Sequence, residues 1–259
     1  MKKIAVISTI SLLVLNILII GCLDNNELKT NVIVIEGKGE YSSIQNAIDN
    51  STKGDTIFVY DGSYYETIVV NKSIKLIGAG KEKPILIYDK NIDGNIINVN
   101  ANNCKIEGFK LIYDINQSES KLTVTGISIS SSKNKILNNT ILNAKYGIQI
   151  LNSEENIISY NNFKNNTDGI EAHKDYYNNI SYNNFSNNTR FGLYLGYESQ
   201  HNKVSFNSFY NNDEAILLSK ETTFSNEISS NTLINNNKGI NECCGAERKN
   251  TIVNNIYNK

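Results

Sequence analysis

The sequence predicts an all-β fold, a single-stranded right-handed parallel β-helix with about 22–24 residues in each coil. Two marks repeat along the chain with that period. The first mark is an asparagine followed within two residues by an apolar side chain, at Asn134, Asn156, Asn179, Asn202, Asn226 and Asn250, with successive steps of 22, 23, 23, 24 and 24 residues. The second is a glycine followed by alternating apolar residues, at Gly126, Gly147, Gly169, Gly192 and Gly239, with Ala215 in the fifth place. A fixed period of this length is typical of a solenoid.

The pattern inside each repeat indicates strands. Gly147-Ile148-Gln149-Ile150 alternates apolar and polar residues, which is the period of a strand with one buried face. No repeat contains a helix-length segment with apolar residues three and four positions apart, which excludes helical solenoids. Three short strands fit into one coil, and neighbouring coils then lie about 4.8 Å apart. The regular repeats are expected over residues 126–259.

The repeated asparagines are expected to form a ladder inside the coil. Stacked amides at strand spacing can bond one another, and they can also satisfy buried backbone groups at the turns. The alternative is that they are exposed turn residues, since Asn is common in turns. Their fixed phase relative to the following Ile136, Ile158, Ile180 and Val204 favours the ladder.

Upstream of the regular repeats, the sequence predicts a capping helix over about residues 42–50. Ser42 and Gln45 have the spacing of a capping box, and Ile44, Ala47 and Ile48 form one apolar stripe. Such a helix would cover the open edge of the first coil. Asn103 marks an earlier coil, and its distance of 31 residues from Asn134 predicts an insertion near 114–121.

The N-terminus predicts export and lipid anchoring. Lys2 and Lys3 precede an apolar stretch, and Ile19-Ile20-Gly21-Cys22 is similar to the lipobox of prokaryotic lipoproteins. Residues 1–21 would then be the signal peptide, 22–30 a polar tether and 31–259 the β-helix domain, with Cys22 carrying the lipid at the outer face of the cytoplasmic membrane or cell envelope. The alternative is an uncleaved transmembrane helix, because the apolar stretch approaches the length that spans a bilayer.

Charge and cysteine content exclude some classes. Lys and Arg number 25 against 26 Asp and Glu, so the basic excess of a nucleic-acid-binding protein is absent. Cys104, Cys243 and Cys244 are too few for a disulfide scaffold. Cys104 and Cys243 are expected about five coils apart, roughly 24 Å, which is too far for a disulfide.

One segment resembles a known family. Ser42-Ser43-Ile44-Gln45-Asn46-Ala47-Ile48, then Gly54-Asp55-Thr56-Ile57-Phe58-Val59 and Leu76-Ile77-Gly78, followed by the repeats, resembles the pectin-lyase-like right-handed β-helix proteins, particularly their NosD-like periplasmic branch and related surface proteins. The resemblance implies the fold. It leaves the activity open, because that family includes polysaccharide lyases, hydrolases, epimerases, surface proteins and copper-site assembly factors.

The candidate site follows from the columns that stacking creates. Glu171, His173 and Tyr194 are expected on one exposed face of adjacent coils, with Asp168 and Arg190 nearby. An aromatic ring beside a carboxylate and an imidazole suits a sugar-binding surface. The alternative is a set of solvated polar residues on an ordinary sheet.

Other chemistries have weaker support in the sequence. Asp168 and Glu214 would lie two coils apart, about 9.6 Å, with Phe191 between them, at the limit for a glycosidase pair. The resemblance to the lyases implies clustered acidic residues for calcium and an Arg or Lys base. Arg190 is the candidate base, but no aspartate cluster accompanies it. His173 and His201 are the two histidines, and no methionine follows the initiator, so a Cu(I) site is poorly supplied. We therefore expect a non-catalytic surface protein that binds carbohydrate or has a structural role, with no metal site assigned and any cofactor unknown.

Overall fold

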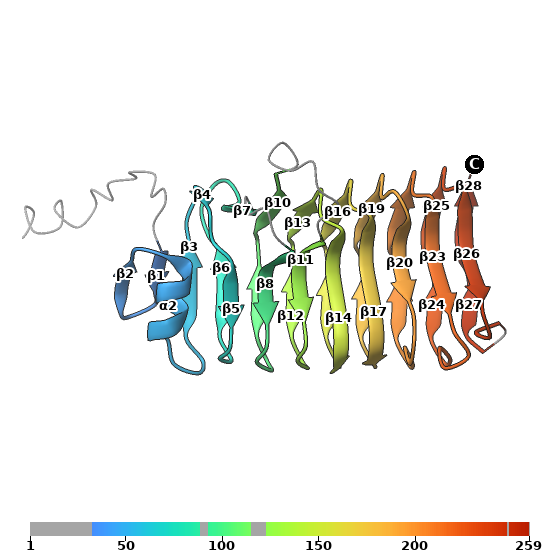
Figure 1. The fold of residues 1–259 in the computed structure, drawn as a ribbon, viewed down its shortest axis with the longest axis horizontal. Coiled ribbons are helices and arrows are strands. Elements are labelled where there is room, and N and C mark those ends of the chain that lie inside the picture. Colours follow the sequence, from blue (N-terminus) through green and yellow to red (C-terminus); the bar gives the residue numbers. More distant parts are fainter. Residues whose placement is uncertain (1–32, 89–92, 115–122, 248, 259) are drawn as a thin grey trace, which may run out of the picture.

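The described part of the protein is a parallel β-solenoid of about eight turns with one short helix. The structure, a computed structural model, describes residues 33–88, 93–114, 123–247 and 249–258. The coils lie side by side along one axis, with the helix and a β-hairpin at one end and strands β26, β27 and β28 at the other (Figure 1). The predicted fold class is confirmed. The predicted signal peptide, tether and Cys22 lie outside the described residues, as does most of the predicted insertion.

Each of the coils from β3 to β26 contributes one strand to each of three sheets; the hairpin of β1 and β2 extends sheet 1 at one end, and β27 and β28 extend sheets 1 and 2 at the other. Sheet 1 contains, in order, β2 (Gly39–Tyr41), β1 (Ile33–Ile35), β3 (Thr56–Val59), β6 (Lys75–Gly78), β9 (Lys105–Glu107), β12 (Lys135–Leu137), β15 (Ile157–Ser159), β18 (Asn179–Ser181), β21 (Lys203–Ser205), β24 (Glu227–Ser229) and β27 (Thr251–Val253). Sheet 2 contains β28 (Ile256–Asn258), β25 (Thr232–Ile234), β22 (Ser208–Tyr210), β19 (Asn184–Ser186), β16 (Asn162–Lys164), β13 (Thr140–Leu142), β10 (Lys110–Tyr113), β7 (Ile85–Tyr88) and β4 (Ser63–Tyr64). Sheet 3 contains β26 (Lys238–Cys243), β23 (Glu214–Ser219), β20 (Phe191–Leu195), β17 (Asp168–Tyr176), β14 (Tyr146–Glu154), β11 (Val124–Ile129), β8 (Gly94–Val99) and β5 (Ile68–Val70).

The core is a set of apolar columns, one for each inward position of the repeat. In-register pairing places Ile136 beside Ile158 and Ile158 beside Ile180, and all three side chains are fully buried. Phe163, Phe185 and Phe209 also stack inside, with ring centroids 4.8 and 4.6 Å apart. Alternation within short strands therefore produces a continuous interior, as the sequence predicts.

The repeated glycines are explained by this interior. A Cβ added to Gly147 would lie 2.5 Å from the carbonyl oxygen of Gly169 and 2.7 Å from the ring of Phe163. Gly169 meets the same two obstacles in the next coil, from the Gly192 carbonyl and the Phe185 ring. The position lacks a side chain because the phenylalanine stack and the neighbouring backbone occupy that space.

Three asparagine ladders connect the corners of successive coils in the described ranges, whereas the sequence predicts a single ladder. Their members are Asn134, Asn156, Asn178, Asn202, Asn226 and Asn250 in the first, Asn139, Asn161, Asn183, Asn207, Asn231 and Asn255 in the second, and Asn166, Asn188, Asn212 and Asn236 in the third. In each ladder the backbone N–H of one asparagine donates to the side-chain oxygen of the next. The bond from Asn156 N to Asn178 Oδ1, for example, is 2.9 Å long. The ladders therefore satisfy corner backbone groups that the fold buries.

The predicted ladder is correct in kind and wrong by one position in one coil. Asn179 is exposed at the start of β18, and Asn178 is the buried ladder member. Upstream, Cys104 occupies the ladder position and donates its N–H to Asn134 Oδ1 at 2.8 Å, whereas Asn103 precedes it with positive φ. The two positions have different explanations. Asn103 occupies the left-handed position before the ladder, where asparagine is also favoured. Asn179 follows the ladder position as the first residue of β18, and Tyr177 is the left-handed residue of that coil.

Asp175 interrupts a column of serines beside the first ladder. Ser153 is in register with Asp175, and each accepts a hydrogen bond from the ladder asparagine three residues later, at 3.3 and 3.1 Å. Asp175 is fully buried and also accepts a hydrogen bond from Ser199 Oγ. Burial raises the pKa of Asp175 to about 6, although the bonds from Ser199 and Asn178 oppose the rise.

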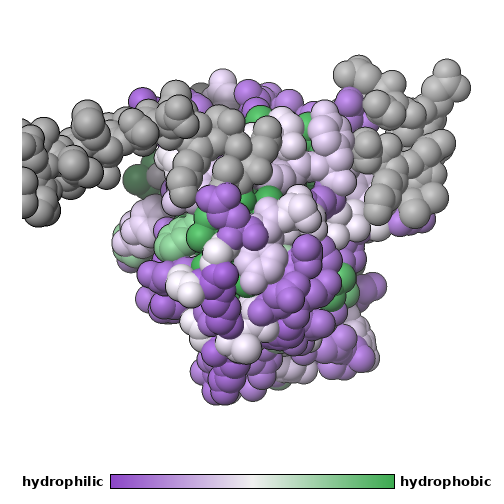
Figure 2. Space-filling view, turned by 90° about the vertical axis from the view of Figure 1, so that its left-hand side faces the viewer, coloured by the Kyte–Doolittle hydropathy of each residue, from purple (hydrophilic) through white to green (hydrophobic). Residues whose placement is uncertain are grey.

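The N-terminal edge is covered as predicted, with a different capping residue. Helix α2 (Ile44–Asn50) buries Ile44, Ala47 and Ile48. Its N-cap is Ser43, which accepts a hydrogen bond from Asn46 N at 3.1 Å, so the predicted Ser42–Gln45 capping box is wrong. Gln45 instead accepts a bond from Val69 N at 2.8 Å. Seen from this end, the described surface is mainly hydrophilic (Figure 2).

Cys104, Cys243 and Cys244 are all free, and Cys104 is buried. Cys104 precedes β9 and Cys243 ends β26, in well-separated coils. Within the described ranges, no helix has the length and apolar character needed to cross a bilayer.

Replacing Asn178 with alanine should destabilise the protein. Asn178→Ala removes a buried side chain and leaves Asn156 N without its acceptor, which should cost on the order of 1–3 kcal/mol. Denaturant unfolding measures the change. The matched control is Asn179→Ala, next in the chain but exposed, which should change stability by less than about 0.5 kcal/mol. Equal effects of the two substitutions would contradict the observed phase of the ladder.

Asp175 should make stability depend on pH. Because its pKa is raised in the folded state, the folded protein binds a proton between pH 4 and 6 that the unfolded chain has lost, so the free energy of unfolding should fall as pH rises through that window. The fall should be on the order of 1–3 kcal/mol. Asp175→Asn should lack this component, and the difference between the two proteins at pH 4 and pH 7 measures it. Parallel pH profiles would show that Asp175 titrates normally.

Candidate functional site

The predicted site residues lie together on the outer face of sheet 3. Glu171 of β17 is in register with Gln149 of β14 on one side and Tyr194 of β20 on the other. His173 lies two residues further along β17, beside Leu151. The predicted juxtaposition is therefore present. The carboxylates, however, are not exposed: Glu171 is only 8% exposed, and Asp168 is fully buried.

Glu171 is held by side chains from three strands or their connections. Gln149 Nε2 donates to its Oε2 at 2.8 Å, His173 Nε2 lies 3.6 Å from its Oε1, and Arg190 Nη2 lies 3.9 Å from the same oxygen. Burial alone would raise the pKa of Glu171. The polar contact with His173, the hydrogen bond from Gln149 and the charge of Arg190 outweigh the effect of burial, so the pKa of Glu171 is lowered. Glu171 is therefore a fixed, ionised acceptor.

Arg190 reaches this site because its corner contains one additional residue. Asn188 and Gly192 are four residues apart, whereas Asn166 and Gly169 in the preceding coil are three apart. As a result, Phe191 is in register with Asp168. The backbone N–H of Arg190 donates a hydrogen bond of 2.9 Å to the carbonyl oxygen of Thr167, the residue before Asp168. The extra residue acts as a bulge, which commonly redirects a side chain.

The redirected guanidinium pairs with Asp168. Arg190 Nε donates to Asp168 Oδ1 at 2.8 Å, and Nη2 donates to Oδ2, in a two-point contact. The backbone N–H of Phe191 donates to Oδ1 at 3.2 Å. Burial raises the pKa of Asp168, and the Arg190 contact offsets part of this rise, while the pKa of Arg190 is raised by its hydrogen bond to Asp168.

Aromatic rings cover these charged groups. The Tyr194 ring lies 5.3 Å from the His173 ring in an edge-on arrangement and 5.3 Å from the tilted ring of Phe191. The Arg190 guanidinium lies 4.6 Å from the centroid of Phe191. Tyr194 and Phe191 are half-buried, so both rings also present surface to solvent. The site combines flat apolar surface with an oriented carboxylate.

The two carboxylates considered for glycoside hydrolysis are engaged elsewhere. Asp168 and Glu214 occupy one column with Phe191 between them, as predicted from the repeat. Asp168 pairs with Arg190, and Glu214 lies 3.6 Å from Lys238 Nζ. Both carboxylates are buried, and Glu214 Oε1 has no hydrogen-bond partner among the described residues. They do not line an open cleft in which a water could lie between them.

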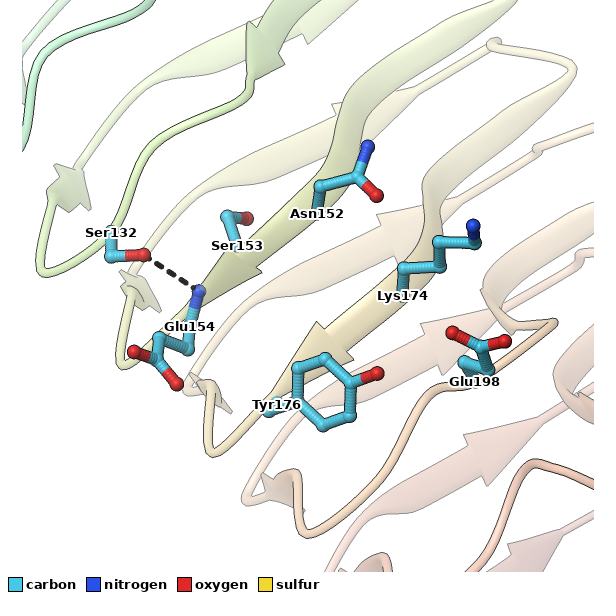
Figure 3. A pocket seen from close by; sticks show the side chains of 7 residues that line it. All are labelled: Ser132, Asn152, Ser153, Glu154, Lys174, Tyr176 and Glu198. Carbon is cyan, nitrogen blue, oxygen red and sulfur yellow. Dashed lines mark hydrogen bonds between the residues drawn. The ribbon is translucent and has the colours of Figure 1, made fainter.

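A shallow hollow of about 350 Å³ adjoins this face where β14 and β17 bend. The bend occurs at Asn152 and Lys174, which both have positive φ. Figure 3 shows the side chains of Lys174, Tyr176 and Glu198 around the opening, with Glu154 held by a hydrogen bond from its N–H to Ser132 Oγ at 3.0 Å. The residues that line the hollow are of polar types and include both signs of charge. Its residues were not predicted, because simple alternation fails where the strand bends.

Columns of exposed aromatic residues are a second feature that the sequence analysis missed. Tyr160, Tyr182 and Phe206 stack with centroids 5.2 and 5.1 Å apart and are 62%, 49% and 52% exposed. Tyr177 and His201 stack at 4.9 Å at another corner. All five have positive φ and directly precede a ladder asparagine. The repeated Ser-Tyr-Asn and Ser-Phe-Asn triplets were the available signal.

No group of three or more His, Cys, Asp or Glu side chains in the described part of the chain is arranged to hold a metal ion. His173 contacts Glu171 and Tyr194, whereas His201 stacks on Tyr177. The two histidines therefore belong to different clusters.

Comparison with curated proteins gives a distant match. Over 106 residues the chain is 38% identical to a cell surface glycoprotein of Methanothermus fervidus. The matched region is 40% of this chain and only 16% of the length of that protein.

Comparison with solved structures supports the fold. The Dettilon tailspike protein superposes with a TM-score of 0.56 at 16% identity, covering 74% of this chain and 46% of that chain. The rice weevil pectin methyl esterase superposes with a TM-score of 0.55 at 9% identity, covering 85% of this chain and 87% of that chain. At these identities the similarity concerns the fold alone.

A family model described as the right handed beta helix region matches residues 125–259. This segment contains the asparagine ladders, the glycine column and the face that carries Glu171. Because the match covers more than half of the sequence, the chain belongs to the right-handed β-helix family.

Proposed function

We propose that this protein is an exported surface protein that binds carbohydrate without catalysis, through the outer face of sheet 3. The observation that carries the proposal is the fixed carboxylate of Glu171 beside the half-buried ring of Tyr194. Sugars present hydroxyl groups around apolar faces. A carboxylate that is already oriented can accept hydroxyl hydrogen bonds, while an adjacent ring packs against C–H groups.

The surroundings of Glu171 favour a neutral or weakly charged polymer over a small anion. Glu171 and Asp168 bring two carboxylates to the site, and Arg190 is occupied by them. The face is also open and continuous along the solenoid, and the hollow at Lys174 and Tyr176 extends it past the bend. An elongated surface suits an extended chain, whereas small ligands usually bind in enclosed concave pockets.

A surface location is supported by two independent observations. The N-terminal apolar stretch and Cys22 have the pattern of a lipoprotein signal. The distant relative is named as a cell surface glycoprotein, which agrees with export of this chain. In this proposal Cys22 carries the lipid that holds the β-helix outside the membrane.

The binding site is tested with substitutions at Tyr194 and Glu171. Glycan-array screening first identifies positive oligosaccharides, and titration calorimetry then measures their affinities. Tyr194→Ala should weaken binding by about tenfold, or ~1.4 kcal/mol, because a stacking surface is lost. A larger effect of Glu171→Gln would indicate that hydrogen bonding to the carboxylate dominates.

The matched control is Tyr160→Ala, which removes an exposed tyrosine outside sheet 3. It should leave the affinity unchanged. Unchanged affinity of the double variant Glu171→Gln, Tyr194→Ala would place the binding site elsewhere. Failure of the wild-type protein to bind any glycan would reject the proposed function itself.

The anchor is tested at Cys22. Cys22→Ser should leave the precursor unprocessed, and mass spectrometry of the native protein should find a lipidated Cys22 at its N-terminus. Finding a mature protein that still begins at Met1 would reject the anchor, with no consequence for the glycan site.

A further inference from the structure

Two adjacent thiols lie at the end of β26, away from the proposed carbohydrate site. Cys243 is the last residue of the strand and Cys244 follows it with a φ of 62°. Their Sγ atoms are 2.8 Å apart, close enough for one thiol to donate a hydrogen bond to the other sulfur. Cys243 is half-buried and Cys244 is exposed, so the pair is accessible from solvent.

The turn that carries the thiols is anchored on both sides. Ala246 N donates to Cys243 O at 3.2 Å, and the Ala246 side chain is fully buried in the core. Glu242 Oε1 accepts a hydrogen bond at 2.9 Å from Asn250 Nδ2, the last member of the first ladder. Cys243 is also in register with Ser219 of β23. The backbone that carries the two cysteines is therefore held in place before any ligand arrives.

The two thiols differ in acidity. Hydrogen bonds from Cys243 and Ser219, together with the charge of Lys220, lower the pKa of Cys244, whereas burial raises the pKa of Cys243. A thiolate is the nucleophilic form of cysteine. Cys244 is also the exposed thiol of the pair, so it is the sulfur that an incoming reagent meets first, with Cys243 as its neighbour.

The geometry restricts the ligand that two sulfurs can chelate. With bonds of roughly 2.3 Å and angles of about 90–110°, the sulfurs would lie roughly 3.3–3.8 Å apart, a small widening of the observed separation. A linear two-coordinate ion would require about 4.6 Å. Tetrahedral zinc would require four ligands, and no third acid, histidine or cysteine of the described residues completes a metal-binding group here. A three-coordinate, pyramidal atom that already carries one substituent needs only the two thiols as its remaining ligands.

We propose that Cys243 and Cys244 form a dithiol site that captures trivalent arsenic, with monosubstituted arsenicals as its ligand class. The Cys244 sulfur attacks arsenic and the Cys243 sulfur follows, so two S–As bonds form. With an arsine oxide, the As=O bond breaks and its oxygen leaves as water with the two thiol protons. Neither sulfur nor arsenic changes its oxidation state.

The probe is phenylarsine oxide, added to the reduced full-length protein. Intact-mass measurement should find one adduct per chain that persists in excess 2-mercaptoethanol and is removed by 2,3-dimercaptopropanol. Joining two sulfurs in one site should raise the affinity by about 10²–10⁴-fold over a single thiol. Peptide mapping should place the adduct on the segment containing both cysteines.

Cys243→Ser and Cys244→Ser should each abolish the persistent adduct, and Cys104→Ser, at the buried cysteine, should retain it. The thermal unfolding midpoint of Cys244→Ser should match the wild type, because that side chain is exposed, so a lost adduct reports chemistry and not misfolding. No persistent adduct on the wild type, or a persistent adduct on both serine variants, would overturn the proposal. The proposal would also be overturned if the protein retained Zn²⁺ through dialysis and did not retain the arsenical.

Discussion

The hydrogen bond from a corner backbone N–H to the side-chain oxygen of an asparagine in the next coil is the interaction on which the rest of the structure depends. A solenoid of three-residue strands turns sharply three times per coil, and each turn buries backbone groups that the sheets leave unpaired. An asparagine amide supplies an acceptor to the coil before it and donors to carbonyls nearby. Asn183, for example, donates through Nδ2 to Ile158 O at 2.8 Å and to Asn207 Oδ1 at 3.1 Å. An aspartate or leucine there could not do both.

The ladders also determine the outer surface. Each of the regular ladder corners from Asn134 to Asn226 is preceded by a residue with positive φ, and this residue projects from the corner. Asparagine tolerates that conformation most easily, yet Tyr160, Tyr182 and Phe206 adopt it in successive coils. Stacking between their rings offsets part of the conformational cost. The same register that aligns buried amides therefore aligns exposed rings, and it places Glu171 beside Tyr194 on sheet 3.

The fold could be predicted from the sequence because its two signals, period and alternation, both arise from stacking. The same reasoning failed where one coil differs locally from the next. Two adjacent asparagines, Asn178 and Asn179, fit the period almost equally well, and only the left-handed residue before the ladder distinguishes them. The grouping of Glu171, His173 and Tyr194 was predictable from alternation. The burial of Glu171 and Asp168 was not, because it depends on Gln149, Arg190 and Phe191 closing over them.

Strand β17 differs most from the corresponding strands of the other coils. It contains three buried acids, and each is accommodated differently. Asp168 pairs with a guanidinium, and Glu171 accepts a hydrogen bond from an amide and lies beside an imidazole. Asp175 accepts hydrogen bonds from a hydroxyl and a ladder asparagine. None of the three is required by the coil, since the in-register residues of β14 are Tyr146, Gln149 and Ser153. The additional residue at Arg190 occurs in the coil directly beside them. Buried charge and an irregular corner both reduce stability in a fold that otherwise repeats small and apolar residues. Such departures are expected where function imposes a requirement that folding does not, and their concentration around Glu171 supports the proposal of a binding surface on this strand.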